Sequence, residues 1–279
     1  MNPTVGSLLD EGARNLADRV EARREAQVLL GHALGVSRAW LSAHGDEAAD
    51  AAAAAVFREL VQRRRAGEPV AYLVGRREFF GLDFRITPDV LIPRADTETL
   101  IETALEKLKQ HARHDVLDLG TGSGCIAIAI AHERSAARVT AVDVSAAALN
   151  VARDNAVAIG VDVEFVQGTW FDGLAGRRFD LIVANPPYVA RDDPHLQQGD
   201  LRFEPATALA SGKDGLTDIR IIVAGAPAYL HAGGWLLFEH GYDQADICRD
   251  LLVDAGFSEI PSRADIAGLP RVADRKSVV

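Results

Sequence analysis

The sequence predicts an α/β protein whose larger part is a mostly parallel β-sheet with helices on both faces, preceded by a small helical domain. Three observations lead to this fold class. From Asp115 onward, strand-like and helix-like segments alternate, which is typical of a parallel sheet covered on both sides. A glycine turn, Gly120–Gly124, follows the first of these strands. Apolar residues recur at helical spacing across residues 4 to 66.

Residues 1–68 are predicted to form the helical domain. Two sets of apolar residues recur at helical spacing, namely Leu8, Leu9, Ala13, Leu16 and Val20, and then Ala26, Leu29, Leu30, Ala33 and Leu34. Gly35 is expected to end the second helix. A third, alanine-rich helix ends in Arg63-Arg64-Arg65. We interpret this basic cluster as a solvated helix end that suits the helix dipole, with a partner-binding patch as the alternative.

Residues 69–97 are predicted to be a connector that also touches the functional site. The segment Phe79–Ile86 indicates a short β-hairpin with its turn near Gly81. A helix is expected from 98 to 110, capped by Thr97 or Asp96.

Residues 98–279 are predicted to form the sheet domain. The expected strands are 115–119, 138–143, 163–167, 179–185 and 235–239, with weaker candidates near 258–264 and 271–275. The expected helices are 125–131, 146–159 with Ser145 as its cap, 215–230 and 243–255.

Composition and charge narrow the function classes. The 279-residue chain is 48% hydrophobic and 25% charged, as in ordinary globular proteins. Residues 1–86 hold 12 Arg and 12 acidic residues, so the net charge of −10 falls on the remainder, with 18 basic and 28 acidic residues. This acidic body argues against a broad nucleic-acid surface. We therefore expect no direct nucleic-acid partner. The chain has no membrane-length apolar run and no signal-peptide pattern, so we expect no membrane association. We also expect a monomer.

The two cysteines, Cys125 and Cys248, lie far apart and lack the spacing of metal ligands. They predict a reduced, cytoplasmic protein without a disulfide framework and without a metal site. We interpret both as small buried apolar residues rather than reactive thiols.

The stretch Phe179–Tyr188 places Asn185 at the carboxyl edge of the sheet. The run Leu181–Ala184 is typical of a strand covered on both faces, and the prolines that follow cannot donate ladder hydrogen bonds. The strand therefore ends at Asn185, where ligands of open α/β sheets bind. The alternative is that Asn-Pro-Pro forms only a rigid turn.

Asn185 and Pro186 offer two fixed acceptors for an incoming –NH2 group. Pro186 restricts Asn185 to extended conformations, and the Asn185 carboxamide oxygen and the Pro186 carbonyl both accept hydrogen bonds. Tyr188 offers a flat face against which a planar amide or base could stack. We hypothesise that this grip aims the nitrogen at an electrophile, an orientation effect of several kcal/mol.

A second constellation predicts a nucleoside cofactor. It consists of the glycine turn, Gly120, Thr121, Gly122, Ser123 and Gly124, together with Asp143. The turn lets a ligand approach the N-terminus of the following helix. Asp143, 23 residues after Gly120, ends the second strand, where a carboxylate typically binds ribose hydroxyls.

Two details favour S-adenosylmethionine over a nicotinamide cofactor. The glycine spacing is GxGxG rather than the dinucleotide pattern GxGxxG. Asp118 precedes the turn, where it could meet an ammonium group, and S-adenosylmethionine has an ammonium and a ribose but no pyrophosphate. Trp170 is expected to lie against the adenine, with core packing as the alternative, and core packing is the preferred interpretation of Phe171.

Together these residues resemble the amino-methylating branch of the Rossmann-like, class I S-adenosylmethionine-dependent methyltransferases. Further segments resemble the protein-(glutamine-N5) methyltransferases that act on peptide chain release factors, and the resemblance covers nearly the whole chain. These segments are Glu68–Gly75, Glu78–Gly81, Val90–Arg94, Glu204–Pro205, Asp214–Leu216 and Glu239–Gly241 with Gln244. Ala95 and Lys213 depart from the family pattern, which often has proline and glycine there, but neither belongs to the residues assigned to chemistry.

The resemblance implies methyl transfer to the side-chain amide nitrogen of the glutamine in the Gly-Gly-Gln motif of class I release factors, with residues 1–68 as the docking surface. It implies that Asn185 and Pro186 are catalytic and hold the substrate together with Pro187, Tyr188 and Arg94. It also implies that the cofactor is held by Gly120–Gly124, Asp143, Trp170 and Asn185.

Two other functions stay open on the sequence. An adenine-N6 methyltransferase acting on DNA or RNA would use the same grip, with Tyr188 stacked on a flipped base. The acidic body and the lack of a basic, aromatic-interleaved segment argue against it. A non-catalytic interaction protein could keep a nucleoside-binding fold as a scaffold, but the intact glycine turn, Asp143 and Asn185 argue against that.

Overall fold

The computed structural model describes residues 3–258, 263–264, 268 and 270–277. The chain divides into two compact units, of which the first comprises Met1–Arg76 and Gly199–Phe203 and the second Arg77–Gln198 and Glu204–Val279. Each unit contains a cluster of buried apolar residues of its own.

The first unit is a helical bundle, as expected. Its core includes the fully buried side chains of Leu8, Leu29, Leu30 and Phe57, and α2 ends at Gly35 as predicted. A short helix in the expected connector, α5, was not predicted. The elements are α1 (Val5–Asn15), α2 (Ala22–Leu34), α3 (Arg38–Ala43), α4 (Ala51–Arg65), α5 (Val70–Val74) and the 3-10 turn η3 (Leu201–Phe203).

Two expectations for the first unit are wrong. Val20 does not belong to an apolar helix face, because α1 ends at Asn15 and Val20 is fully exposed. Arg64 is not part of a solvated helix end, because it is only 5% exposed and binds both Glu25, at 2.8 Å, and Asp200, at 2.7 Å. Burial acts to lower the pKa of Arg64, but these two carboxylates outweigh it and the pKa is raised.

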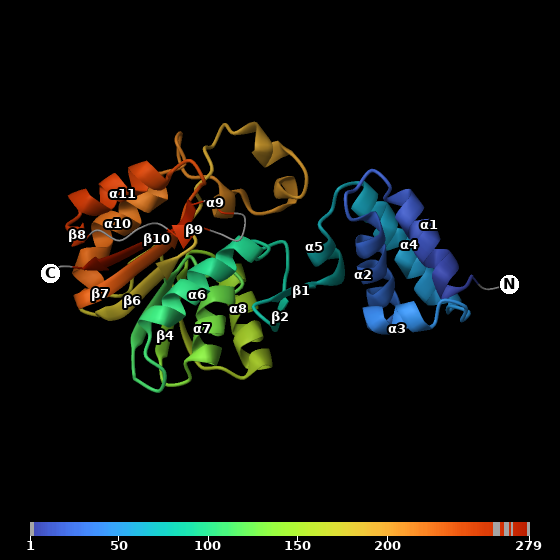
Figure 1. The fold of residues 1–279 in the computed structure, drawn as a ribbon, viewed down its shortest axis with the longest axis horizontal. Coiled ribbons are helices and arrows are strands. Elements are labelled where there is room, and N and C mark those ends of the chain that lie inside the picture. The colour runs from blue at the N-terminus through green and yellow to red at the C-terminus, as the bar shows by residue number, and fades with distance from the viewer. Residues whose placement is uncertain (1–2, 259–262, 265–267, 269, 278–279) are drawn as a thin grey trace. The chain divides into compact units, whose positions relative to one another are not determined.

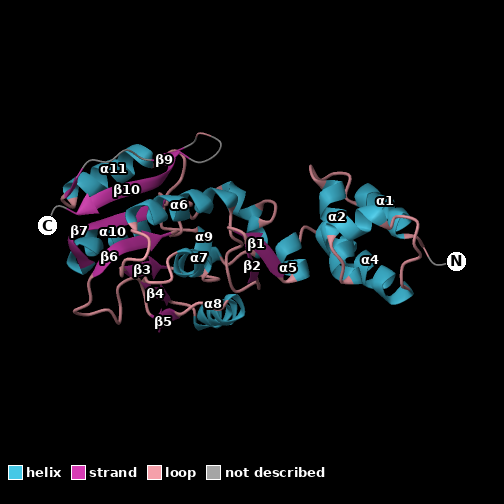
Figure 2. Cartoon of the chain, turned by 60° about the horizontal axis from the view of Figure 1, so that its bottom comes forward, coloured by secondary structure: helices cyan, strands magenta, loops and turns pink. Residues whose placement is uncertain are grey.

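The second unit is built on one large sheet with the strand order β5-β4-β3-β6-β7-β10-β8, and β9 pairs with β10. In Figure 2 the strands from β5 to β10 form one continuous layer. The pairs from β5 to β7 are parallel, whereas β10 is antiparallel to its neighbours. The strands are β3 (Asp115–Leu119), β4 (Arg138–Asp143), β5 (Val163–Gln167), β6 (Phe179–Ala184), β7 (Leu230–Glu239), β8 (Phe257–Ser258), β9 (Arg263–Ala264) and β10 (Pro270–Ser277).

The predicted parallel sheet is therefore confirmed, and the candidate strand at 271–275 lies within β10. The candidate near 258–264 corresponds to β8 and β9, and its residues 259–262 lie outside the described part of the chain. Strand β7 begins earlier than expected, at Leu230, directly after α10.

Helices cover both faces of this sheet. Helices α6, α7 and α8 lie on one side and α10 and α11 on the other (Figure 1). The apolar residues of α10, such as Ile219 and Val223, pack against Ile182 and Phe238 in the buried core. The helices and 3-10 turns are η1 (Ala95–Thr97), α6 (Glu98–Lys107), α7 (Cys125–Glu133), α8 (Ala146–Ile159), η2 (Pro194–Gln197), α9 (Ala206–Leu209), α10 (Thr217–Tyr229) and α11 (Ala245–Asp254).

The expected hairpin is present as β1 (Arg76–Phe79) and β2 (Leu82–Arg85), which turn at Phe80–Gly81. Of the two expected caps of the following helix, Thr97 is wrong. Thr97 has helical backbone angles and makes no capping bond, because its side chain turns into the protein, where it is 2% exposed. Helix α6 ends at Lys107 rather than at residue 110.

Candidate active site

Four neighbouring strands of the second unit end in register at one edge of the sheet. Leu119 of β3 pairs with Val142 of β4 and with Ala184 of β6, and Ala184 pairs with Phe238 of β7. The residues that follow are Gly120, Asp143, Asn185 and Glu239. The chain runs from β3 outward through β4 to β5 and returns to the other side of β3 with β6. This is a topological switch point, where open α/β sheets bind ligands.

The glycine turn lies between β3 and α7 and is held against β4. The backbone N–H groups of Gly120 and Thr121 donate to the Val142 carbonyl, at 2.8 and 3.0 Å. Gly120 has a φ of +74°, which only glycine adopts without strain. A Cβ atom at Gly120 would also lie 3.3 Å from Cζ3 of Trp170. The turn therefore needs glycine at this position both for its backbone and for close contact with the Trp170 ring.

Asp143 ends β4 with its carboxylate fixed by two backbone groups. The N–H of Gly122 donates to Oδ2 and the N–H of Ser145 donates to Oδ1, both at 2.8 Å. Each oxygen keeps lone-pair capacity for a further donor. The side chain of Ser145 caps α8, as predicted, by accepting from the N–H of Ala148. A half-buried carboxylate held in this way suits the hydroxyl groups of a ribose.

Trp170 follows β5 and lies against the same turn. It has a left-handed backbone with a φ of +51°, an unusual conformation for a bulky residue. Its ring packs beside Gly120, and the residue is half-buried. Phe171 turns away and stacks on Tyr229, with the ring centroids 4.6 Å apart. The preferred packing interpretation of Phe171 thus agrees with the structure, and the adenine contact of Trp170 stays a prediction.

Asp118 is a fully buried carboxyl group immediately before the turn. Its Oδ2 accepts from the hydroxyl of Thr121 at 2.6 Å, and its Oδ1 has no hydrogen-bond partner among the residues that the structure describes. Burial raises the pKa of Asp118 to about 7, against hydrogen bonds from the Thr121 hydroxyl and the Ala127 backbone N–H. An unpartnered carboxyl oxygen at the glycine turn fits the ammonium group of the S-adenosylmethionine expected from the sequence.

Asn185 follows β6 and its carboxamide is hydrogen-bonded. Its Nδ2 donates to Oγ1 of Thr97 at 3.1 Å, and Thr97 in turn donates to Oε2 of Glu239 at 2.7 Å. The hydroxyl of Tyr188 donates to the other Glu239 oxygen at 2.8 Å. The structure therefore joins two predicted site residues, Asn185 and Tyr188, through two residues to which no role in the site was assigned.

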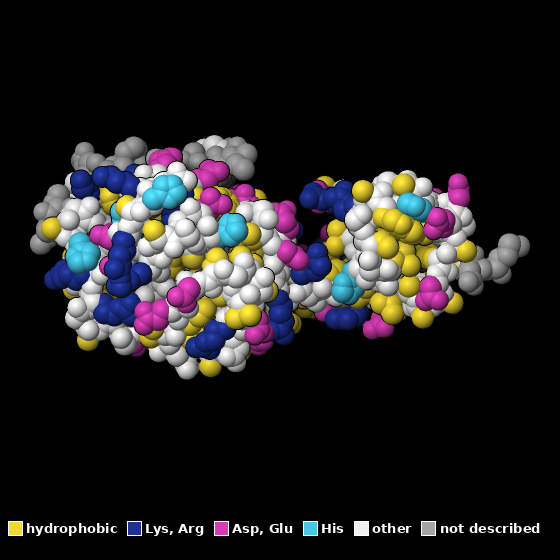
Figure 3. Space-filling model, turned by 90° about the horizontal axis from the view of Figure 1, so that it is seen from below, with side chains coloured by type: hydrophobic (Ala, Val, Ile, Leu, Met, Phe, Trp, Pro, Cys, Tyr) yellow, Lys and Arg dark blue, Asp and Glu magenta, His cyan; other side chains and the backbone are white. Residues whose placement is uncertain are grey.

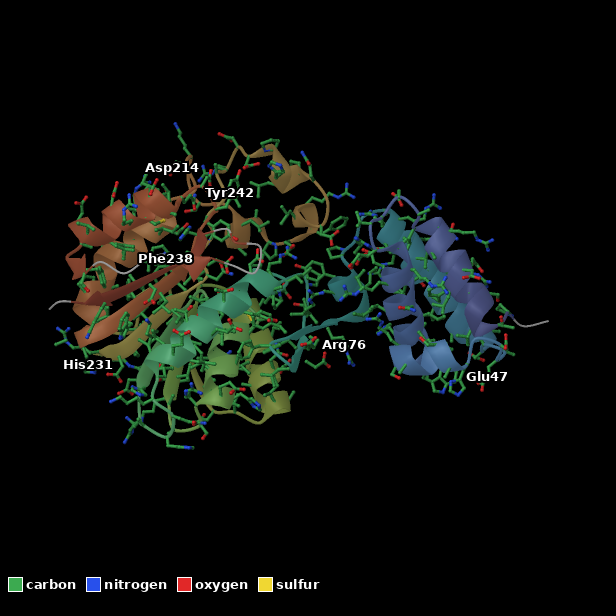
Figure 4. All side chains as sticks on the ribbon, viewed as in Figure 1. Glu47, Arg76, Asp214, His231, Phe238 and Tyr242 are labelled. Atoms are coloured by element: carbon green, nitrogen blue, oxygen red, sulfur yellow. The ribbon has the colours of Figure 1, made fainter. Side chains whose placement is uncertain are left out.

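The roles of Thr97 and Glu239 were missed for different reasons. Thr97 precedes a helix, and a threonine there usually caps it. Glu239 directly follows the apolar run Leu236–Phe238, and an acidic residue that ends a buried strand is a signal that sequence reasoning could have used. Phe238 and Tyr242, which flank this end of β7, are labelled in Figure 4.

Arg94 forms an ion pair with Glu204, whose side chain is completely buried. The other Glu204 oxygen accepts from the N–H of Ile92 at 3.0 Å. Glu204 thus ties the connector to the segment that follows Tyr188. The predicted contact of Arg94 with the substrate stays a prediction, as do those of Pro186 and Pro187, of which Pro186 is buried.

Two general features of the described residues bear on the function class. No helix among them is both long and apolar enough to cross a membrane, and no group of three or more His, Cys, Asp and Glu side chains could hold a metal ion. On the face of the second unit in Figure 3, basic and acidic side chains are interspersed.

This chain is similar to known proteins along most of its length. A family model described as "PrmC N-terminal domain" matches residues 7–75, and one described as "Methyltransferase small domain" matches residues 96–212. The release factor glutamine methyltransferase of Xylella fastidiosa strain 9a5c is 54% identical over 256 residues, covering 91% of this chain and 93% of that protein. The chain belongs to the release factor glutamine methyltransferase family.

Other relatives in this family are similar over the same extent. The release factor glutamine methyltransferase of Bordetella pertussis is 52% identical over 259 residues, which cover 92% of this chain and 96% of that protein. Among solved structures, a methyltransferase from Pyrococcus furiosus matches with a TM-score of 0.54 and 18% identity, covering 79% of this chain and 97% of that one. That likeness supports the fold of this family member.

Proposed function

We propose that this chain transfers a methyl group from S-adenosylmethionine to the side-chain amide nitrogen, N5, of the glutamine in the Gly-Gly-Gln motif of class I peptide chain release factors. Membership of the family supports the substrate class. The observation that carries the proposal is Asn185, which lies at the end of β6 beside the glycine turn, with its Nδ2 already bonded to Thr97. The Asn185 oxygen is thereby left to accept from an incoming –NH2 group.

The proposed chemistry depends on orientation. A carboxamide nitrogen is a poor nucleophile because its lone pair is delocalised into the carbonyl group. Asn185 Oδ1 and the Pro186 carbonyl accept hydrogen bonds from its two N–H groups. These bonds favour a more pyramidal nitrogen and direct its lone pair toward the methyl group of the cofactor. When bound, the cofactor supplies an electrophilic methyl group, so that the N–C bond forms as the S–C bond breaks and S-adenosylhomocysteine leaves. The surplus proton is lost to water.

The cofactor residues are proposed from the same edge of the sheet. Asp143 holds the ribose hydroxyls, Asp118 meets the ammonium group, and Trp170 covers the adenine. The glycine turn, Gly120–Gly124, lets the cofactor approach the backbone, and Asn185 borders the transferred methyl group.

The division of labour along the chain is also proposed. Residues 1–68 dock the release factor, residues 69–97 connect, and residues 98–279 carry the chemistry. The chain acts as a monomer in the cytoplasm, where buried free thiols such as Cys125 and Cys248 are ordinary. Neither a nucleic acid nor a membrane takes part directly, and no metal is required.

The test is methyl transfer from labelled S-adenosylmethionine to a purified class I release factor. The same assay includes a factor whose loop glutamine is changed to alanine, bare tRNA and duplex DNA. Label on the intact factor alone is expected. Label on the altered factor would contradict the assignment of the glutamine. Label on nucleic acid that falls steeply with salt would favour the adenine-N6 activity instead.

A further inference from the structure

A directed chain of hydrogen bonds ends at Asn185. It runs from Asn185 Nδ2 to Thr97 Oγ1, at 3.1 Å, and from Thr97 Oγ1 to Glu239 Oε2, at 2.7 Å. Thr97 and Glu239 are 2% and 1% exposed. The chain spans three elements of the second unit, since Thr97 ends η1, Asn185 follows β6 and Glu239 ends β7.

The carboxylate at the end gives this chain its direction. A carboxylate only accepts hydrogen bonds, whereas a hydroxyl can donate one and accept others. The Thr97 hydroxyl must therefore donate its hydrogen bond to Glu239, which leaves its oxygen as an acceptor. Only the NH2 end of Asn185 can then face Thr97. The oxygen and the NH2 group of a carboxamide are almost equal in shape, so hydrogen bonds such as these decide which of the two points away from Thr97.

We propose that Glu239, acting through Thr97, is a positioning residue that keeps the Asn185 oxygen turned toward the substrate amide. This inference rests on the proposed function, because it concerns how Asn185 recognises the two N–H bonds of the glutamine. Glu239 itself touches neither substrate nor cofactor in this account. The second donor to Glu239, the Tyr188 hydroxyl at 2.8 Å, holds the carboxylate in place.

Replacing Glu239 by glutamine is the sharpest test, because it changes polarity with little change in shape. If the glutamine oxygen takes the bond from Tyr188, as Glu239 does, its NH2 group donates to Thr97. Thr97 would then donate to the Asn185 oxygen, and the Asn185 carboxamide would turn its NH2 group to the substrate. Two NH2 groups would face each other, so the inverted chain opposes binding of glutamine in the reactive orientation.

The experiment measures kcat and KM for the release factor, the affinity for S-adenosylhomocysteine and the melting temperature. Glu239→Gln is expected to lower kcat/KM about 100-fold, as removal of an oriented donor does at other sites. Its cofactor affinity is expected to stay within about twofold of the wild type. Glu164→Gln is the matched control, since Glu164 lies on β5 and pairs with Arg177. This control is expected to keep wild-type activity.

A release factor with glutamate in place of the loop glutamine adds a second measurement, the preference for glutamine over glutamate. This preference would not change if Glu239 only stabilised the fold. A carboxylate offers acceptors only, so the wild type is expected to bind this factor more weakly than the glutamine form. Glu239→Gln presents an NH2 group, and its preference for glutamine over glutamate is expected to fall about tenfold. An unchanged preference in Glu239→Gln, together with equal activity of Thr97→Ser and Thr97→Val, would overturn the proposal.

Thr97 supplies a second, independent pair of variants. Thr97→Ser keeps the hydroxyl and is expected to retain activity, whereas Thr97→Val removes it and is expected to lose about tenfold in kcat/KM. This pair tests the proposal even if Glu239→Gln does not fold, because equal activity of the two variants would contradict the positioning of Asn185 through Thr97. The wild-type protein separates the two claims, since a wild type that leaves the glutamine unmodified contradicts the proposed function instead.

Discussion

At the residue scale, Gly120 and Gly122 allow backbone strain to be separated from steric contact. Both have positive φ, +74° and +56°, but only at Gly120 would an added Cβ atom meet a neighbour within 4 Å, the ring of Trp170. An alanine at Gly122 is expected to cost about 1–2 kcal/mol of stability through its left-handed backbone alone. Gly120→Ala is expected to cost more and to weaken cofactor affinity, because it also displaces Trp170.

Urea unfolding and titration with S-adenosylhomocysteine measure both effects. Equal losses of stability and affinity in Gly120→Ala and Gly122→Ala would show that the contact with Trp170 has no consequence. A larger loss in Gly120→Ala is the expected result.

Asp118 gives the cofactor-free protein a distinct pH dependence. Burial raises the pKa of this carboxyl to about 7, whereas an unfolded aspartate titrates near pH 3.9. Between these values the folded chain binds more protons, so the free energy of unfolding falls as the pH rises from about 4 to 7. This group contributes at most about 1.4 kcal/mol per pH unit to that fall. Asp143, Thr121 and Cys125 are its polar neighbours.

Unfolding of the wild type and of Asp118→Asn at pH 5 and pH 7.5 isolates this contribution. The wild type is expected to lose more stability than the variant between the two values. The affinity for S-adenosylmethionine is expected to rise with pH in the wild type alone, because its ammonium favours the ionised carboxyl. Parallel pH profiles of the two proteins would contradict this account.

Sequence reasoning at this scale succeeded where a role follows from position on a strand. Asn185 and Asp143 end apolar strands, so their place at one sheet edge could be predicted from the pattern alone. Thr97 could not be placed in this way, because its partners Asn185 and Glu239 lie 88 and 142 residues away in the sequence. The buried position of Arg64 has the same cause, since Asp200 is 136 residues distant.

At the element scale, Asn155 of α8 joins the hairpin to the glycine turn. Its Oδ1 accepts from the N–H of Arg85 at 2.7 Å, and its Nδ2 donates to the carbonyls of Arg85 and Ser123, at 3.1 and 2.9 Å. Asn155→Ala would leave three backbone groups without these bonds and is expected to cost about 2–4 kcal/mol. Cofactor affinity is expected to fall as well, since the turn loses a support.

Asn150→Ala is the matched control on the same helix. Asn150 is exposed and accepts from the exposed Arg153, so its loss is expected to cost less than about 0.5 kcal/mol. Chemical denaturation of both variants measures the difference. Similar costs for Asn150→Ala and Asn155→Ala would argue against the supporting role of Asn155.

Most elements of the sheet unit could be predicted because their signals are local. The strands β3, β4 and β5 have the expected bounds, and the Ser145 cap is where the sequence places it. Helix ends were less predictable where no glycine or proline marks them, as at the end of α6 at Lys107, whereas α11 ends just before Gly256, whose φ is +82°. The antiparallel direction of β10 also depends on tertiary pairing with β7, which no local pattern carries.

At the scale of the whole molecule, two separate apolar cores predict two unfolding transitions. The first unit is centred on residues such as Leu29 and Phe57, and the second on residues such as Ile182 and Phe238. S-Adenosylhomocysteine is expected to stabilise only the second unit against unfolding, by about 2.7 kcal/mol at 100 times its dissociation constant. Arg64→Met is expected to shift only the unfolding transition of the first unit.

Differential scanning calorimetry with and without S-adenosylhomocysteine distinguishes the two transitions. A single transition that moves as a whole with the ligand would show that the two units unfold together. The expected result is one peak that moves with the ligand and one that moves with Arg64→Met.

The central claim is that Asn185 orients the substrate amide for methyl transfer. It is tested most directly by single-turnover methylation of the release factor by Asn185→Ala, with cofactor affinity measured on the same preparation. The account predicts a rate at least about 100-fold below that of the wild type, with S-adenosylhomocysteine bound almost as tightly. Near-normal turnover by Asn185→Ala would contradict it.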